Sequence, residues 1–227
     1  ARTMLISAAV IGTSSATTDT KGNYSLSVPK DTPYTMTVSN DGYLTLNEQE
    51  WKLSGDADRG QTLAVANGIE AILKNALNPI PTDTLAVLSV NVVATGSCTS
   101  AIGATLSVPG IPQPSDAGAD DGGDAGGTTD AGTGGPHLVY FAGGFPTANT
   151  SVTDTSTPSA VIYDLPVGMF SQITVNHPTC TAVAFPVADP SIPTLTYTGN
   201  VKLEASGPKD DAGVTQNVAS FMRVFLK

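Results

Sequence analysis

The sequence predicts an all-β protein, and its composition carries that prediction. The chain has 227 residues, of which 23 are glycine and 16 are proline, while only 13% are charged. β-Branched residues are abundant, and together with the turn-forming glycines and prolines they are typical of many short strands joined by turns. A chain of this length can form one large domain or two modest ones. We expect two β-sandwich domains with one connecting helix.

The first third of the chain is predicted to contain strands followed by the helix. Strands are expected at residues 3–10, 23–28, 33–39 and 43–53, with a turn rich in Asp, Gly and Asn between the first two. Apolar residues then recur at helical spacing between 60 and 77, namely Leu63, Ala66, Ile69, Leu73 and Ala76. Asn78 and Pro79 provide a stop signal. We expect this helix to pack its apolar stripe on a sheet.

The rest of the chain is predicted to be strands. Residues 85–93, LAVLSVNVV, form a nearly continuous apolar run that indicates a buried strand. Further strands are expected at residues 103–108, 137–142, 159–165, 169–176, 194–205 and 217–226. Short strands at this density, separated by turn residues, favour a sandwich over an α/β arrangement.

An internal repeat predicts the domain boundaries. TTDTKGNYSLSVPKDTPYTMTVSNDG and VTDTSTPSAVIYDLPVGMFSQITVNHPT both carry T-D-T, a strand, a proline and a second strand. The prolines are Pro29 and Pro166, and the second strand ends nine residues later, at Val38 or Val175. ATLSV at 104–108 likewise corresponds to the opening ARTMLIS. The predicted domains are 1–53 and 85–227, and segment 54–84, which contains the helix, connects them.

Four segments resemble the carboxypeptidase-regulatory-like domain, a transthyretin-like β-sandwich. They are TDTKGNYSLSVP (18–29), YTMTVSNDGY (34–43), GATLSV (103–108) and LPVGMFSQITV (165–175). In the second half the glycine of the T-D-x-x-G pattern has been lost, as TDTSTP shows. The resemblance implies two divergent copies of a transthyretin-like or immunoglobulin-like sandwich. In bacteria such domains are similar to non-catalytic extracellular modules, and the catalytic residues of the namesake enzymes lie in a separate domain.

Charge and motif content argue against several kinds of partner. A net charge of −10 argues against nucleic acid and against an anionic membrane surface. The apolar run in ARTMLISAAVIG is too short and too interrupted for a transmembrane segment, so we expect any export signal to lie upstream. Two histidines and scattered serines form no recognisable catalytic triad. We do not expect an enzyme.

The two cysteines, Cys98 and Cys180, are predicted to form a disulfide. An acidic chain rich in Thr, Ser, Gly and Asn fits an exported protein, and we expect a bacterial cell-surface or extracellular location. Together with His137 and His177, the cysteines also have the ligand count of a zinc site, although no C-x-x-C pair is present. Free buried thiols are the third alternative.

The acidic stretch at residues 115–135 is predicted to be a loop within the second domain, because predicted strands of that domain flank it. Its Asp116, Asp120, Asp121 and Asp124 offer the hard oxygen ligands that calcium prefers, and calcium is the one cofactor we consider. The spacing lacks the alternating aspartates and the terminal glutamate of an EF-hand. The alternative is a solvated, flexible acidic loop.

The aromatic residues raise the question of glycan binding. A sugar-stacking platform could draw on Tyr24, Tyr34, Tyr43, Trp51, Tyr140, Phe141 and Phe145. Most of them occupy alternating strand positions, which favours packing in the core. Trp51, between Glu50 and Lys52, could either pack against the helix or face solvent.

The register of the repeat predicts an exported structural protein. The first domain lacks a counterpart of LAVLSVNVV, so its opening strand should present an open edge at Met4, Leu5, Ile6, Ala8 and Val10. A strand donated by a neighbouring subunit would fill this edge and join a homo-oligomer or filament. An upstream segment or the helix could fill it instead. The alternative function is a glycan- or calcium-binding accessory module of a surface protein.

Overall fold

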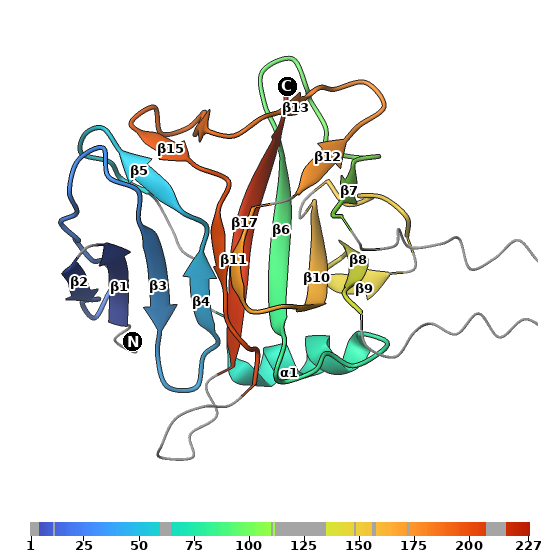
Figure 1. Ribbon diagram of the computed structural model, residues 1–227, viewed down its shortest axis with the longest axis horizontal. Helices are drawn as coiled ribbons and strands as arrows, with labels where there is room; N and C mark the ends of the chain where they lie inside the picture. Colours follow the sequence, from blue (N-terminus) through green and yellow to red (C-terminus); the bar gives the residue numbers. More distant parts are fainter. Residues whose placement is uncertain are drawn as a thin grey trace, which may run out of the picture.

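The computed structural model confirms an all-β protein, with one short helix among the residues that it describes (Figure 1). It describes residues 5–10, 12–59, 65–109, 111, 135–147, 149–155, 158–171, 173–207 and 217–227. A ten-stranded sheet forms its centre, and nine of its strands follow the order β2–β1–β3–β4–β17–β6–β10–β8–β9, with β13 paired to β17. Their bounds are β1 Leu5–Val10, β2 Gly12–Thr17, β3 Thr35–Ser39, β4 Thr45–Glu48, β6 Ala86–Ala94, β8 His137–Ala142, β9 Phe145–Thr147, β10 Ser159–Leu165, β13 Ala182–Val183 and β17 Val218–Leu226.

Three small sheets and the helix complete the fold. The small sheets pair β11 (Gly168–Phe170) with β16 (Val201–Leu203), β12 (Thr174–Asn176) with β7 (Thr105–Ser107), and β14 (Val187–Ala188) with β15 (Leu195–Tyr197) and β5 (Trp51–Leu53). The predicted helix is present as α1, Asn67–Ala76, and lies across one end of the central strands (Figure 1). The helix ends before Leu77, whose backbone is extended. The N–H of Leu77 donates to the carbonyl of Lys74 at 3.2 Å.

β17 joins the two predicted domains in one sheet. It runs parallel to β4, with Val218 opposite Thr45, and parallel to β6, with Ser220 opposite Leu88. Parallel neighbours cannot be joined by a tight hairpin, so the chain must cross over before it completes the sheet. Because strands of both predicted domains share one hydrogen-bonded sheet, a division into two separate sandwiches is not confirmed.

The larger hydrophobic core lies between the central sheet and the small sheets. β6 shows why: every second side chain from Ala86 to Val92 is fully buried, as the period of a strand requires. Side chains of β10, β17, β7, β12 and β16 join this core, among them Ile162, Met222, Leu106, Val175 and Val201. A second core contains Tyr34, Met36, Val38, Trp51, Leu195, Tyr197 and Phe225.

Residues 23–28 are not a strand, which corrects the prediction. The side chain of Asp19 accepts hydrogen bonds from the N–H groups of Lys21 and Asn23, at 2.8 and 2.9 Å, and closes the turn before this segment. The alternating apolar residues after it, Tyr24, Leu26 and Val28, pack against the second core without belonging to a strand. Side-chain burial alone therefore produced a strand-like pattern.

The segments that the repeat aligns have different structures. Val38 lies in β3 of the central sheet, whereas Val175 lies in β12 of a small sheet. The strand before Pro166 is β10, whereas no strand occupies residues 23–28 before Pro29. The repeated pattern of residues does not correspond to a repeated arrangement of strands.

Candidate functional site: a pocket lined by aromatic residues and arginine

β1 is not an open edge, which corrects the predicted assembly site. Leu5 lies opposite Thr17 of β2 on one side and opposite Ser39 of β3 on the other. Ile6 and Ala8 are paired on both sides as well, and Val10 is paired with Gly12. Strand donation to β1 is therefore wrong, because β2, which the sequence analysis missed, fills that position. Met4 lies outside the described residues.

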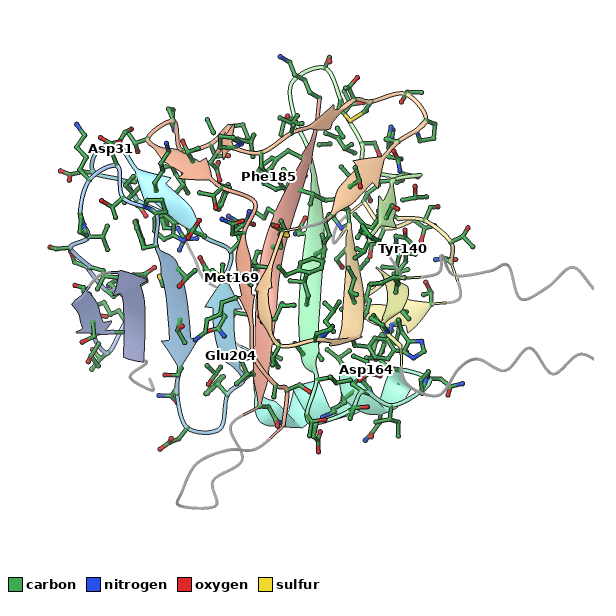
Figure 2. The ribbon with its side chains drawn as sticks, viewed as in Figure 1. Asp31, Tyr140, Asp164, Met169, Phe185 and Glu204 are labelled. Atoms are coloured by element: carbon green, nitrogen blue, oxygen red, sulfur yellow. A yellow bond between two sulfur atoms is a disulfide. The ribbon has the colours of Figure 1, made fainter. Side chains whose placement is uncertain are left out.

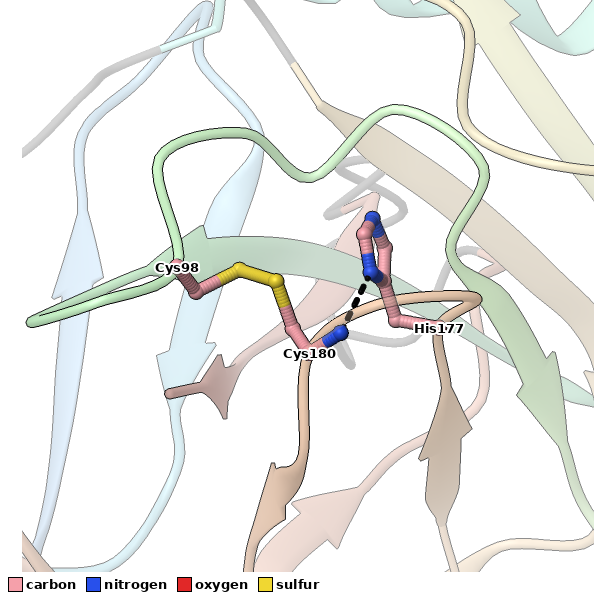
Figure 3. Close-up of side chains that lie close together, drawn as sticks. All are labelled: Cys98, His177 and Cys180. Atoms are coloured by element: carbon pink, nitrogen blue, oxygen red, sulfur yellow. Dashed lines mark hydrogen bonds between the residues drawn. A yellow bond between two sulfur atoms is a disulfide. The ribbon is translucent and has the colours of Figure 1, made fainter.

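The predicted disulfide is present between Cys98 and Cys180, which are 82 residues apart (Figure 3). It connects the loop after β6 to the loop after β12. Next to it, the Nδ1 atom of His177 accepts the N–H of Cys180 at 3.0 Å, and Nε2 lies 2.8 Å from the carbonyl of Ile102. A backbone N–H can only donate, so Nδ1 is the acceptor and Nε2 carries the proton.

The disulfide decides against the alternative of a zinc site. The ligand atoms of Cys98, His177 and Cys180 lie within 4.8 Å of one another. Zinc binds cysteine as the thiolate, however, and the two sulfurs are bonded to each other. His137 lies elsewhere, on β8, and its ring stacks on that of Tyr163 with centroids 5.0 Å apart.

The acidic stretch, apart from Gly135, lies outside the part of the chain that the structure describes. Asp116, Asp120, Asp121 and Asp124 lie outside the described residues. Calcium binding by these aspartates therefore stays a prediction.

Most of the aromatic residues pack in the interior. Tyr34, Trp51, Tyr140 and Phe141 are buried, and the hydroxyl oxygen of Tyr140 accepts the N–H of Leu106 at 2.8 Å (Tyr140 is labelled in Figure 2). Phe145 is 56% exposed, and Tyr24 and Tyr43 are half-buried. These residues form no common stacking platform, but Tyr24, Tyr34 and Trp51 meet at one pocket.

This pocket has a volume of about 620 Å³ and lies beside the second core. We call it the aromatic–arginine pocket. Its polar lining comes from Thr18, Lys21, Asn23, Ser25, Asp58 and Arg59, and its apolar and aromatic lining comes from Tyr24, Leu26, Val28, Tyr34, Met36, Val38, Trp51 and Leu53. The turn closed by Asp19 holds the polar segment at residues 21–25 in place.

Trp51 is at the centre of the inner wall. Its ring lies 4.2 Å from the ring of Tyr34, between centroids, and the guanidinium carbon of Arg59 lies 4.1 Å from its centroid. Arg59 in turn forms an ion pair with Glu48 of β4 at 2.5 Å. Trp51 is only 3% exposed, so the tryptophan does not face solvent. Its ring instead packs against the guanidinium of Arg59, which lines the pocket.

Burial controls the protonation of this wall. Loss of solvent raises the pKa of Tyr34 well above its ordinary value, so its hydroxyl stays protonated in neutral solution. Burial opposes the charge of Arg59, but the adjacent carboxylate of Glu48 overcomes it and raises the pKa of the guanidinium. The pocket therefore contains a permanent cation whose charge is neutralised by one carboxylate.

Three polar atoms at this wall are buried without a hydrogen-bond partner among the described residues. They are the hydroxyl oxygen of Tyr34, Nε1 of Trp51 and Nε of Arg59. Each such group costs about 1–3 kcal/mol of stability. Native proteins keep few groups of this kind, and each calls for an explanation such as a functional role. The three atoms belong to residues that line or adjoin the pocket whose polar lining includes Lys21, Asn23, Ser25 and Asp58.

Sequence reasoning named Trp51 and Tyr34 but missed Arg59. No local pattern connects Arg59 with Glu48, because β5 and the residues after it separate the two along the chain. One signal was present: Arg59 is the lone cation in the acidic segment SGDADRG.

No helix within the described part of the chain is long and apolar enough to cross a membrane. No protein-family model, no curated protein and no solved structure matches the chain. The resemblance to carboxypeptidase-regulatory-like domains stays a prediction.

Proposed function

We propose that the chain is an exported, non-catalytic protein of a bacterial cell surface or extracellular assembly, and that the aromatic–arginine pocket binds a glycan. The observation that carries the proposal is a rim of hydrogen-bonding side chains around an aromatic wall with unsatisfied polar atoms. The acidic composition and the disulfide support export. Glycan binding gives the pocket a role that does not require self-assembly.

The chemistry of the rim suits a neutral polar ligand. Asn23 and Asp58 present hydrogen-bond acceptors, and Lys21, Asn23 and Ser25 present donors, which is the mixture that sugar hydroxyls need. Leu26, Val28 and Leu53 offer apolar surface for the C–H groups of a sugar ring. Because Glu48 neutralises Arg59, the pocket has no excess positive charge to favour a strongly anionic ligand.

Isothermal titration with a panel of neutral mono- and disaccharides tests the proposal. Lys21→Ala removes a rim donor and should weaken binding about tenfold, the loss expected for one good hydrogen bond to a charged group. Lys30→Ala is the matched control, since Lys30 is exposed and does not line the pocket. Absence of saturable binding across the panel, or equal effects of the two variants, would contradict glycan recognition at this site.

A structural role in an assembly is the second candidate, and β2 now supports it in place of β1. β2 forms one end of the central sheet, and its sequence GTSSAT contains no charge or proline. Natural edge strands commonly carry charged residues or proline, which prevent pairing with other chains. Sedimentation equilibrium should therefore show self-association without a ligand, and the exposed substitution Ser15→Lys should reduce it. A monomer at all concentrations would contradict this role.

A further inference from the structure

A second cavity lies on the opposite face of the central sheet from the larger core. It has a volume of about 470 Å³, within the range of roughly 300–1,000 Å³ typical of small-molecule sites. We call it the outer groove. Its lining is mainly apolar and comes from the sheet residues Leu46, Val87, Val161, Val218 and Phe221 and from Leu73 and Leu77 at the end of α1.

The outer groove arises because the central strands are apolar on both faces. In β6 the buried residues Leu88 and Val90 point into the larger core, so Val87, Ser89 and Asn91 lie on the other face. Val161 of β10 and Phe221 of β17 both lie opposite Ser89 and share that face. These side chains are only partly buried, so the apolar surface of the groove is still accessible.

Strand register arranges the groove from apolar to polar. Near α1, Leu46 of β4 lies opposite Ala219 of β17, with Leu73 and Leu77 alongside. Four residues farther along β17, Arg223 lies opposite Asn91, and Asn91 lies opposite Ser159 of β10. One end of the groove is thus hydrocarbon and the other presents a guanidinium, an amide and a hydroxyl.

Arg223 is suited to receive an anionic group. Among the described residues, both polar partners of its guanidinium, the hydroxyl of Tyr197 and the carboxylate of Asp189, contact Nη1. A guanidinium has five N–H donors in a planar fork that matches a carboxylate. Asp189 lies 4.0 Å away and also accepts the N–H of Ser191 at 2.8 Å and the Tyr197 hydroxyl at 3.2 Å, so it neutralises Arg223 only in part.

The other cation of the groove is already committed. Lys74, near the apolar end, forms an ion pair with Asp83, and Glu48 is paired with Arg59. Arg223 is therefore the group that would set the orientation of an amphipathic ligand. The rings of Phe221 and Tyr197 lie 5.5 and 5.7 Å from its guanidinium carbon and help to hold it in position.

We propose that the outer groove binds a long-chain carboxylic acid, with its acyl chain over Phe221 and Val161 toward α1 and its carboxylate at Arg223 and Asn91. The apolar lining accounts for the chain, and the charge of Arg223 accounts for the head group. This site is separate from the aromatic–arginine pocket, so its test does not depend on the glycan proposal.

Titration calorimetry with palmitate, below its aggregation concentration, tests the assignment, and hexadecanol is the matched ligand without a carboxylate. We expect saturable binding of palmitate and at least about tenfold weaker binding of the alcohol, because only the acid gains the charged pair. Arg223→Lys should weaken palmitate binding while leaving the alcohol unchanged, since lysine keeps the charge but loses the planar fork. Equal affinity for the two ligands would overturn the assigned head-group site.

Two variants localise the ligand to the groove. Val161→Asp places a repelling carboxylate on its floor and should abolish palmitate binding, whereas Val167→Asp, at an exposed position outside the groove, should not. If Val161→Asp fails to fold, as judged by circular dichroism, Ser89→Trp fills the same space without a charge. Binding that survives in the folded variant would place the ligand elsewhere. The chain could instead self-associate through this face. In that case Val161→Asp would disperse the oligomer and palmitate would not, and the groove would be a contact between copies.

Discussion

Glu48 and Arg59 form an ion pair in which the two side chains keep only 8% and 10% of their exposure. Glu48 ends β4 in the central sheet, and Arg59 follows β5 in a small sheet. The pair therefore connects β4 of the central sheet to the segment that follows β5. Through the contact of Arg59 with Trp51, it also positions the arginine in the aromatic–arginine pocket.

Replacing Arg59 by methionine should destabilise the protein strongly. The substitution leaves the carboxylate of Glu48 buried without its partner, a change that costs about 3–5 kcal/mol. Urea unfolding followed by Trp51 fluorescence measures the loss. Lys202→Met is the control, because Lys202 and its partner Glu204 are much more exposed and such surface pairs contribute about 0–1 kcal/mol. If Glu48→Leu combined with Arg59→Met is no more stable than Arg59→Met alone, the uncompensated charge is not the cause.

Asp164 should tolerate asparagine but not alanine. It lies at the bulge of β10 with a φ of 59°, and its carboxylate accepts the N–H of Thr82 at 2.7 Å, which holds the loop after α1 (Figure 2). Asparagine keeps an acceptor and enters this left-handed conformation readily. Alanine loses this hydrogen bond to a charged group, at a cost of about 1.5–3 kcal/mol. Thermal unfolding distinguishes them, and equal stability of the two variants would contradict a role for this hydrogen bond.

Removal of the disulfide should lower stability by about 4 kcal/mol. The bond closes a loop of 82 residues, and the chain-entropy model assigns roughly this value to such a loop. The variant carrying both Cys98→Ala and Cys180→Ala should show the loss in denaturant unfolding, and a reductant should produce a similar loss in the unaltered protein. The reductant must leave the double variant unchanged. Insensitivity of the unaltered protein to complete reduction would refute this expectation.

Stability should fall in alkaline solution because buried tyrosines resist ionisation. Burial, assisted by the charge of Asp164, raises the pKa of Tyr163 to about 12, from about 10 in an unfolded chain. A raised pKa means that the unfolded state releases its proton first. The stability that protonated Tyr163 contributes to the folded state is therefore complete below pH 10, and it is lost as the pH rises through about 12. Burial raises the pKa of Tyr34, Tyr140 and Tyr197 as well.

Tyr163→Phe separates this residue from the other tyrosines. The hydroxyl of Tyr163 has no hydrogen-bond partner among the described residues, so phenylalanine keeps the packing and removes the ionisable group. We expect the variant to lose less stability than the unaltered protein between pH 10 and 12. Absorbance at 295 nm reports tyrosinate formation alongside unfolding. Identical pH profiles would show that Tyr163 does not contribute.

Local chemistry was enough to predict most of the elements. The nearly continuous apolar run LAVLSVNVV identified β6, and helical spacing followed by Asn78 and Pro79 identified α1. The disulfide followed from composition and from the position of Cys98 and Cys180 at strand ends. Each of these inferences uses residues that are neighbours in sequence or a property of the whole chain.

Pattern alone failed where a segment's hydrogen-bond partners are distant. Residues 23–28 alternate like a strand but pack as an irregular segment, whereas the polar run GTSSAT forms β2 because β1 lies beside it. Side-chain period reports which face is buried, and it does not report whether a backbone partner is present.

The sequence by itself determined that this protein is all-β, and it predicted the helix and the bridge between the two cysteines that the described residues show. Only the tertiary structure decided that β17 joins both halves in a single sheet, that β1 is closed on both sides, and that Arg59 meets Glu48 and Trp51. The physical reason is that strand pairing and pocket formation are choices among many distant segments with similar local preferences. Their free energies depend on the whole set of contacts, which no short stretch of sequence contains.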